Sequence, residues 1–162
     1  MIRRSVERER SQDAASHGGQ CGTIAAIYNE GIADRIATFE TEPRTAEQIA
    51  EWFTGRQLVS VAEAEKAGAV AFAASFPYSD RACYSGIGEF SVYVRRDFRG
   101  RGAGRVFLSA LVETAAAAGL HKLTSRVFPE NLASRALLKG SVSTKSESIA
   151  VMESWMVAGA TA

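Results

Sequence analysis

A short run of glycines and arginines is the part of the chain whose residue types most directly suggest chemistry. Residues 99–105 read Arg-Gly-Arg-Gly-Ala-Gly-Arg, and they stand between a β-rich apolar segment and a segment with helical periodicity. Glycines let the backbone approach an anion closely, and unpaired N–H groups at the start of a helix stabilise it. The loop therefore predicts a phosphate site.

Two common phosphate motifs do not fit this loop. A Walker A motif needs a Gly-Lys pair followed by Ser or Thr, and the chain has no such pair. A dinucleotide fingerprint starting at Gly100 or Gly102 fails because Arg105 or Phe107 stands where Gly or Ala is required. What remains is an Arg-x-x-Gly-x-Gly pattern beginning at Arg99, which suits a polyphosphate such as coenzyme A. The alternative is a tight strand–helix turn with solvated arginines.

The spacing of apolar residues predicts the elements that position this loop. The predicted helices are residues 22–30, 46–54, the segment after the loop as far as Gly119, and residues 132–138 capped by Asn131. The predicted strands are residues 57–63, 69–76, 82–94 and 122–127. Because short turns join the strands that precede the loop, this order indicates an α+β fold rather than a doubly wound sheet.

Composition limits the class of protein. A chain of 162 residues, 46% hydrophobic and 23% charged, predicts one domain with a real core. A net charge of +1 argues against a nucleic-acid partner, and no apolar run is long enough to span a membrane. With no apolar leader at the N-terminus, a cytoplasmic protein is expected. Neither the two cysteines nor the scattered histidines predict a metal site.

Several motifs, taken in order, resemble the GNAT acetyltransferase superfamily and, within it, the phosphinothricin- and arsinothricin-type N-acetyltransferases. They are residues 27–29, 37–43, 89–94 (Glu-Phe-Ser-Val-Tyr-Val), 99–104 and 129–134 (Pro-Glu-Asn-Leu-Ala-Ser). The resemblance covers residues 22–139. It implies the GNAT acyl-CoA N-acyltransferase fold, in which helices flank a mixed, mostly antiparallel central sheet.

The same resemblance implies acetyl-CoA as co-substrate. The backbone of Val92 and Val94 would pair with the pantetheine and acetyl group, and the loop amides would hold the pyrophosphate. Asn131 would hydrogen-bond the pantetheine arm, with Ser134 nearby. The residues assigned to the cofactor are Val92, Val94, Arg99, Gly100, Arg101, Gly102, Ala103, Gly104, Arg105, Asn131 and Ser134.

Acetyl transfer to an amine needs a proton acceptor and a stabilised oxyanion. Glu89, between Gly88 and Phe90, matches the family's catalytic glutamate and is the candidate base. The plainer interpretation is a surface glutamate at the end of a strand. Cys83 would share a strand face with Glu89, so an acetyl-cysteine intermediate is the alternative to direct transfer in a ternary complex.

The substrate is expected to be a small amino-acid-like amine. Arg81 and Tyr84 fall where the subfamily has an arginine and a tyrosine, and an arginine would bind the carboxylate or phosphinate of the substrate. Phe39 would wall the pocket. Ser79 stands where the subfamily often has a basic residue, and this is a departure from the pattern.

The resemblance implies a homodimer that acetylates the α-amino group of phosphinothricin, arsinothricin or methionine sulfoximine analogues. Another amine (a polyamine, peptide or aminoglycoside) and a CoA-binding module without activity stay open.

The two ends of the single domain, residues 1–162, differ from its middle. Residues 1–20 are polar and are expected to be partly mobile. After Gly140 the chain lacks the family's Gly-Phe pair and the apolar residues for its two further strands. Within this atypical tail, residues 141–162, we expect residues 141–148 to form a mobile loop. We expect residues 149–157 to dock on the sheet edge or on a partner chain.

Overall fold

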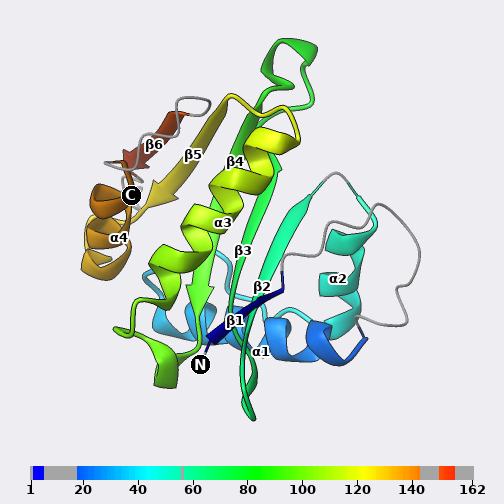
Figure 1. The fold of residues 1–162 in the computed structure, drawn as a ribbon, viewed down its shortest axis with the longest axis vertical. Helices are drawn as coiled ribbons and strands as arrows, with labels where there is room; N and C mark the ends of the chain where they lie inside the picture. Colours follow the sequence, from blue (N-terminus) through cyan, green and yellow to red (C-terminus); the bar gives the residue numbers. More distant parts are fainter. Residues whose placement is uncertain (1, 6–17, 56, 143–149, 156–162) are drawn as a thin grey trace, which may run out of the picture.

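The computed structural model describes residues 2–5, 18–55, 57–142 and 150–155 (Figure 1). These residues form a six-stranded sheet in the order β1-β2-β3-β4-β5-β6. The strands are β1 (Ile2–Ser5), β2 (Leu58–Ala64), β3 (Gly68–Pro77), β4 (Ile87–Val94), β5 (Lys122–Val127) and β6 (Ala150–Trp155). Strands β1 to β4 pair antiparallel in sequence, whereas β4 with β5 and β5 with β6 pair parallel. The predicted α+β fold with a mixed, mostly antiparallel sheet is confirmed.

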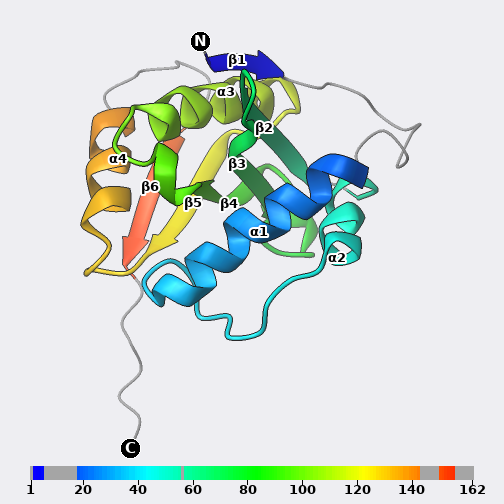
Figure 2. The same cartoon turned by 90° about the horizontal axis from the view of Figure 1, so that it is seen from below.

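Helices cover both faces of this sheet (Figure 2). Helices α1 (Gly18–Asp34) and α2 (Ala46–Ala50) lie on one face, and α3 (Ala103–Ala117) and α4 (Leu132–Val142) lie on the other. Each face has its own buried apolar cluster, built on β3 and β4 because successive side chains of a strand point to opposite faces. The largest buried side chains between α3 and the sheet are Phe90, Phe107, Leu108, Leu111 and Leu123, and those on the face of α1 and α2 are Ile24, Ile27, Ile49 and Phe72.

The predicted strand over residues 82–94 is wrong at its start. Residues Ala82–Tyr84 form one turn of 3₁₀ helix, closed by the Tyr84 N–H donating to the Arg81 carbonyl at 2.9 Å. The strand begins only at Ile87, after Gly86, where a Cβ would overlap the ring of His121. Residues 81, 83 and 85 therefore do not continue the face of β4 that carries Glu89.

Several local signals are confirmed. Gly119 has a φ of 87° after α3, as its placement as a left-handed cap predicted, and β5 has the predicted bounds. Helix α1 is longer than expected and begins at Gly18, within the stretch expected to be partly mobile. In that stretch, residues 2–5 form the edge strand β1, while residues 6–17 lie outside the described residues.

The C-terminal part combines a longer helix with an edge strand. Residues 141 and 142, expected in a mobile loop, belong to α4, and residues 143–149 lie outside the described residues. Residues 150–155 pair with β5 as strand β6, so the described part of the segment expected to dock does lie on the sheet edge. Among the described residues, no helix has the length and apolar character needed to cross a membrane.

Candidate active site

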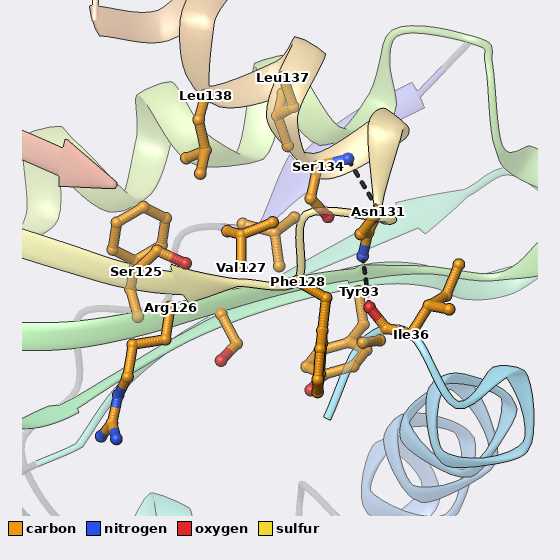
Figure 3. A pocket seen from close by; sticks show the side chains of 14 residues that line it. Ile36, Tyr93, Ser125, Arg126, Val127, Phe128, Asn131, Ser134, Leu137 and Leu138 are labelled. Atoms are coloured by element: carbon orange, nitrogen blue, oxygen red, sulfur yellow. Dashed lines mark hydrogen bonds between the residues drawn. The ribbon is translucent and has the colours of Figure 1, made fainter. Parts of the chain in front are cut away.

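A groove opens where β4 and β5 separate. The two parallel strands pair from Ile87↔Lys122 to Glu89↔Thr124, whereas β4 stays paired with β3 as far as Val94. The edge of β4 beyond Glu89 therefore faces the groove without a partner strand among the described residues. Such an edge offers backbone donors and acceptors to an extended ligand. The groove is lined by Ile36, Ala37, Phe90, Ser91, Val92, Tyr93, Ser125, Arg126, Val127, Phe128, Asn131, Ser134, Leu137 and Leu138 (Figure 3).

Asn131 stands at the far wall of this groove, and its side chain makes two hydrogen bonds with other described residues (Figure 3). Its Oδ1 accepts from the Ser134 N–H at 3.0 Å, which confirms the predicted cap of α4. Its Nδ2 donates to the Ile36 carbonyl at 3.0 Å and so ties α4 to the segment after α1. Asn131 thus connects two segments that line the groove, the start of α4 and the chain at Ile36. Ser134 also lines the groove.

The glycine loop presents its amides at the start of α3. Gly100 and Gly102 have φ values of 74° and 81°, in the left-handed region that favours glycine. In the described part of the chain, no group accepts from the backbone N–H groups of residues 100–104, and the first bond of the helix runs from the Arg105 N–H to the Gly102 carbonyl. Unpaired amides at the positive end of a fifteen-residue helix form an anion site.

Two residues of this loop have structural contacts that the sequence did not predict. Arg99 turns toward α1, where its Nη1 lies 2.7 Å from Asp34, and its Nε donates to the Val94 carbonyl at 2.9 Å. Arg99 therefore anchors the loop, and one of the backbone groups expected to pair with pantetheine already has a partner. A Cβ at Gly104 would lie 3.2 Å from Leu137 Cδ2, so this glycine also lets α3 approach α4.

The ion pairs of Asp34 join α1 to the loop. The carboxylate accepts from Arg96 at 2.6 Å and from Arg99 at 2.7 Å. Burial alone would raise the pKa of Asp34, but the hydrogen bonds from the two guanidinium groups outweigh it and leave this pKa below its ordinary value.

A second, larger cavity adjoins the groove on the side of α1 and α2. Its volume of about 440 Å³ is in the range of sites for small molecules. The two spaces share Ala37, Phe90, Ser91, Tyr93 and Arg126. The other residues of the cavity are Tyr28, Thr38, Phe39, Glu40, Arg44, Trp52, Phe72, Ala74, Phe76, Pro77 and Glu89. A ligand in the cavity would thus meet a ligand in the groove beside Glu89 and Arg126.

Glu89 is paired with Arg126, a residue that the sequence analysis missed. The Arg126 Nε donates to Glu89 Oε1 at 2.7 Å, and its Nη2 donates to Oε2, so the pair is bidentate. Its hydrogen bonds to Glu89 raise the pKa of Arg126. Glu89 is 26% exposed and Arg126 is 55% exposed. The alternation of β5, in which Leu123, Ser125 and Val127 are buried, is the signal that sets Arg126 on the other face.

A second arginine–glutamate pair lines the same cavity. Arg44 donates to Glu40 through Nε at 2.8 Å and Nη2 at 2.7 Å, and these bonds hold the pKa of Glu40 below its ordinary value. The backbone N–H and carbonyl of Arg44 are both bonded to the side chain of Asn29. Nearby, burial strongly raises the pKa of Tyr93, which keeps this phenol a hydrogen-bond donor.

Three other predicted residues lie apart from the cavity. Arg81, Cys83 and Tyr84 are on the loop between β3 and β4, and none of them lines the groove or the cavity. Arg81 stacks over the Tyr84 ring at 5.7 Å, and Cys83 is exposed. Phe39 does line the cavity, with its ring centroid 4.5 Å from that of Phe128. Among the described residues, no group of three or more His, Cys, Asp or Glu could hold a metal ion.

Comparison with known proteins decides the family. Residues 24–140 match the Acetyltransferase (GNAT) family. The chain belongs to the GNAT acetyltransferase family. Enzymes of this family take the acetyl group from acetyl-CoA, so this GNAT protein is an acetyl-CoA-dependent N-acetyltransferase. Its residues fit that co-substrate, because the unpaired loop amides suit phosphates and the free edge of β4 suits an extended amide chain.

Named relatives of this GNAT enzyme act on different amines. It is 33% identical over 118 residues to the L-methionine sulfoximine/L-methionine sulfone acetyltransferase of Pseudomonas paraeruginosa, covering 68% of this chain and 67% of the relative. It is 30% identical over 120 residues to the phosphinothricin N-acetyltransferase of Streptomyces coelicolor, covering 70% of each. The crystal structure of ribosomal-protein-alanine N-acetyltransferase from Brucella melitensis superposes with a TM-score of 0.72 at 26% identity, over 86% of this chain and 82% of that one.

Proposed function

We propose that this GNAT enzyme acetylates the α-amino group of a small amino-acid-like substrate of the phosphinothricin, arsinothricin or methionine sulfoximine class. The observation that carries the proposal is the junction of the groove with the 440 Å³ cavity beside Glu89. An amine in the cavity would there meet an acyl group in the groove with a carboxylate at hand. Direct transfer between two bound substrates needs this adjacency.

In this proposal the chain holds acetyl-CoA along three surfaces. The free edge of β4, above all the backbone of Val92, would pair with the pantetheine arm, and Asn131 and Ser134 would line its other side. The amides of Gly100, Arg101, Gly102, Ala103 and Gly104 would receive the pyrophosphate. Arg101 and Arg105 would add positive charge there, whereas Arg99 would act through its contacts with Asp34 and Val94.

Glu89 would take the proton that the substrate amine must lose. Acetyl-CoA supplies an activated acyl group: a C–N bond forms as the C–S bond breaks, and the leaving sulfur takes the second proton that the nitrogen loses, so that the coenzyme departs as its thiol. The proton of the substrate ammonium would pass to the Glu89 carboxylate, directly or through one water. Cys83 would have no part in this route, because it lies on the loop between β3 and β4 and lines neither space.

The charges of the cavity support an amino acid as acceptor. Its walls carry two glutamates and two arginines in pairs, Glu89 with Arg126 and Glu40 with Arg44. A zwitterion with an ammonium and one or two oxyanions would find complementary groups of both signs there, whereas a polycation would meet the two arginines together with the two glutamates. The relatives named for methionine sulfoximine and phosphinothricin support the same class of substrate.

The test is turnover of an amine panel by the unmodified enzyme and by Glu89→Gln. We expect acidic amino-acid analogues to be acetylated in preference to polyamines and peptides. Glu89→Gln should lower kcat on the order of 10²-fold or more near neutral pH, while acetyl-CoA affinity stays close to that of the unmodified enzyme.

Glu40→Gln is the matched control, because it removes a second carboxylate of the same cavity that also pairs with an arginine. Its effect should fall on KM rather than on kcat. Turnover of polyamines or peptides alone would refute the proposed substrate. Wild-type turnover by Glu89→Gln would refute the proposed base.

A further inference from the structure

The pair between Glu89 and Arg126 occupies the place where the proposed reaction needs a free carboxylate. Both Glu89 oxygens accept from the Arg126 guanidinium, and the pair lies where β4 and β5 part. A carboxylate held bidentately has its best acceptor positions filled by N–H groups. In this arrangement Glu89 is a poor partner for an incoming ammonium until Arg126 moves away.

An α-carboxylate of the substrate offers Arg126 the same chemistry as Glu89 does. The planar guanidinium fork binds any carboxylate through two parallel N–H···O bonds, so moving from one carboxylate to another conserves both bonds. Arg126 is 55% exposed, and in Figure 3 its side chain extends from β5 away from α4, on the side opposite Leu137 and Leu138. With more than half of its side chain exposed, Arg126 has solvent beside it into which the guanidinium can turn.

We propose that Arg126 is the anchor for the substrate's α-carboxylate, and that its transfer from Glu89 to that carboxylate releases Glu89 to accept the amine proton. The inference rests on the proposed function and adds a residue and a selection step to it. An amine without a neighbouring carboxylate leaves Glu89 paired. The enzyme therefore discriminates against such amines at the proton-transfer step as well as in binding.

Arg44 is the other arginine of the cavity, and its position does not suit this task. Arg126 lines both the groove and the cavity and contacts Glu89 directly, whereas Arg44 lines the cavity alone. In an amino acid only two bonds separate the amine nitrogen from the carboxylate carbon, so the anchor must lie beside the base. The Arg44 guanidinium pairs with Glu40, and the Asn29 amide fixes the Arg44 backbone in place through its N–H and carbonyl.

The test compares one substrate with its α-carboxamide, which keeps the amine and removes the carboxylate charge. For L-methionine sulfoximine against its amide, we expect the unmodified enzyme to prefer the acid by about 10²-fold or more in kcat/KM. Arg126→Met should reduce this preference to less than about tenfold, mainly by raising KM for the acid. The kcat for the amide should hold or rise, because Glu89 is then unpaired.

Arg126→Lys keeps the positive charge but lacks the two parallel N–H donors of the guanidinium. It should restore part of the preference for the acid, and it replaces the Met variant if that one does not fold.

Arg44→Met is the matched control, and it should keep the preference for the acid. Loss of the preference in Arg44→Met but not in Arg126→Met would place the carboxylate at Arg44 and overturn the inference. If Arg126→Met lowers kcat/KM equally for the acid and the amide, Arg126 has only a structural role, and this result would also overturn the inference. Absence of turnover of either compound by the unmodified enzyme would instead refute the proposed function, and the inference with it.

Discussion

The glycines of residues 99–105 belong to one sequence motif, but Gly102 precedes α3 and Gly104 lies in its first turn, and each is explained by a different physical cause. Gly102 is needed for its backbone conformation, since its φ is 81° and a Cβ built there would meet nothing within 4 Å. Gly104 instead lies close to another helix, since a Cβ there would stand 3.2 Å from Leu137 Cδ2 of α4, and this side chain would have to shift by a few tenths of an ångström. A substitution at Gly104 therefore disturbs helix packing together with the anion site, and Gly102 is the cleaner probe.

Gly102→Ala should weaken coenzyme A binding without loss of the fold. A residue with a Cβ in the left-handed region is strained by roughly 1–2 kcal/mol. The free loop of the variant relieves this strain by leaving the left-handed conformation, so binding must restore it and the Kd for coenzyme A rises about 5- to 30-fold. Calorimetry should show the rise for coenzyme A but not for S-acetyl-pantetheine, which lacks the pyrophosphate.

Gly22→Ala is the control for that experiment. Gly22 lies inside α1, and a Cβ there would also meet nothing within 4 Å. This change should leave coenzyme A binding unchanged and stabilise the helix by up to about 1 kcal/mol. Wild-type affinity in Gly102→Ala, or an equal loss for both ligands, would contradict the role of the loop conformation.

At the scale of elements, the ion pairs at the end of α1 hold the glycine loop against the sheet. Asp34 receives Arg96 and Arg99, and Arg99 also bonds the last carbonyl of β4 at Val94. One carboxylate thus links a helix, a strand and the anion loop. Because the side chain of Asp34 is 22% exposed, its pairs are screened less than fully exposed ones.

Asp34→Asn should destabilise the fold at neutral pH and loosen the loop. The folded-state pKa of Asp34 lies below its ordinary value, so its contribution is complete above about pH 4 and is lost as pH falls through the folded pKa. Urea unfolding should give a difference of about 1 kcal/mol from the unmodified protein at pH 7, and this difference should shrink toward zero as pH falls through the folded-state pKa of Asp34. Acetyl-CoA affinity should fall in parallel at pH 7.

Asp97→Asn is the matched control for this pair. Asp97 binds Arg95 at 2.7 Å on the same connection, but its side chain is 61% exposed. Its removal should have the smaller effect on unfolding and no effect on acetyl-CoA affinity. If Asp34→Asn and the unmodified protein have the same urea unfolding curves at every pH, the ion pairs of Asp34 do not stabilise the fold.

The sequence predicted those elements whose signals are local. The cap at Asn131 and the left-handed Gly119 depend on residues within one turn, and both are confirmed. The pairing of Glu89 with Arg126 depends on the register Glu89↔Thr124 between strands that α3 separates in the chain. No local pattern encodes that register. The turn at Ala82–Tyr84 was missed because its residues carry no strong turn signal, and Gly86 alone marks the break.

At the scale of the whole molecule, the two ends of the chain complete the sheet. Strand β1 pairs with β2 at one edge, and β6 pairs with β5 over residues 150–155 at the other (Figure 1). Strand β5 carries Arg126 and forms one wall of the groove. The edge strand β6 is thus the outer support of the candidate active site, and an unpaired β5 would leave a row of backbone groups open to other chains.

A chain that ends at Val142 should therefore lose stability and gain self-association. Removing β6 breaks the hydrogen bonds of a six-residue parallel pairing, roughly 2–5 kcal/mol at about 1 kcal/mol for each net bond. Thermal unfolding should move to lower temperature, and amide exchange should accelerate across residues 122–127. A chain that ends at Trp155 keeps β6, so it should retain the unfolding temperature and the slow amide exchange of residues 122–127. If the shorter chain has the same melting temperature and the same protection in β5 as the longer one, β6 does not support the groove.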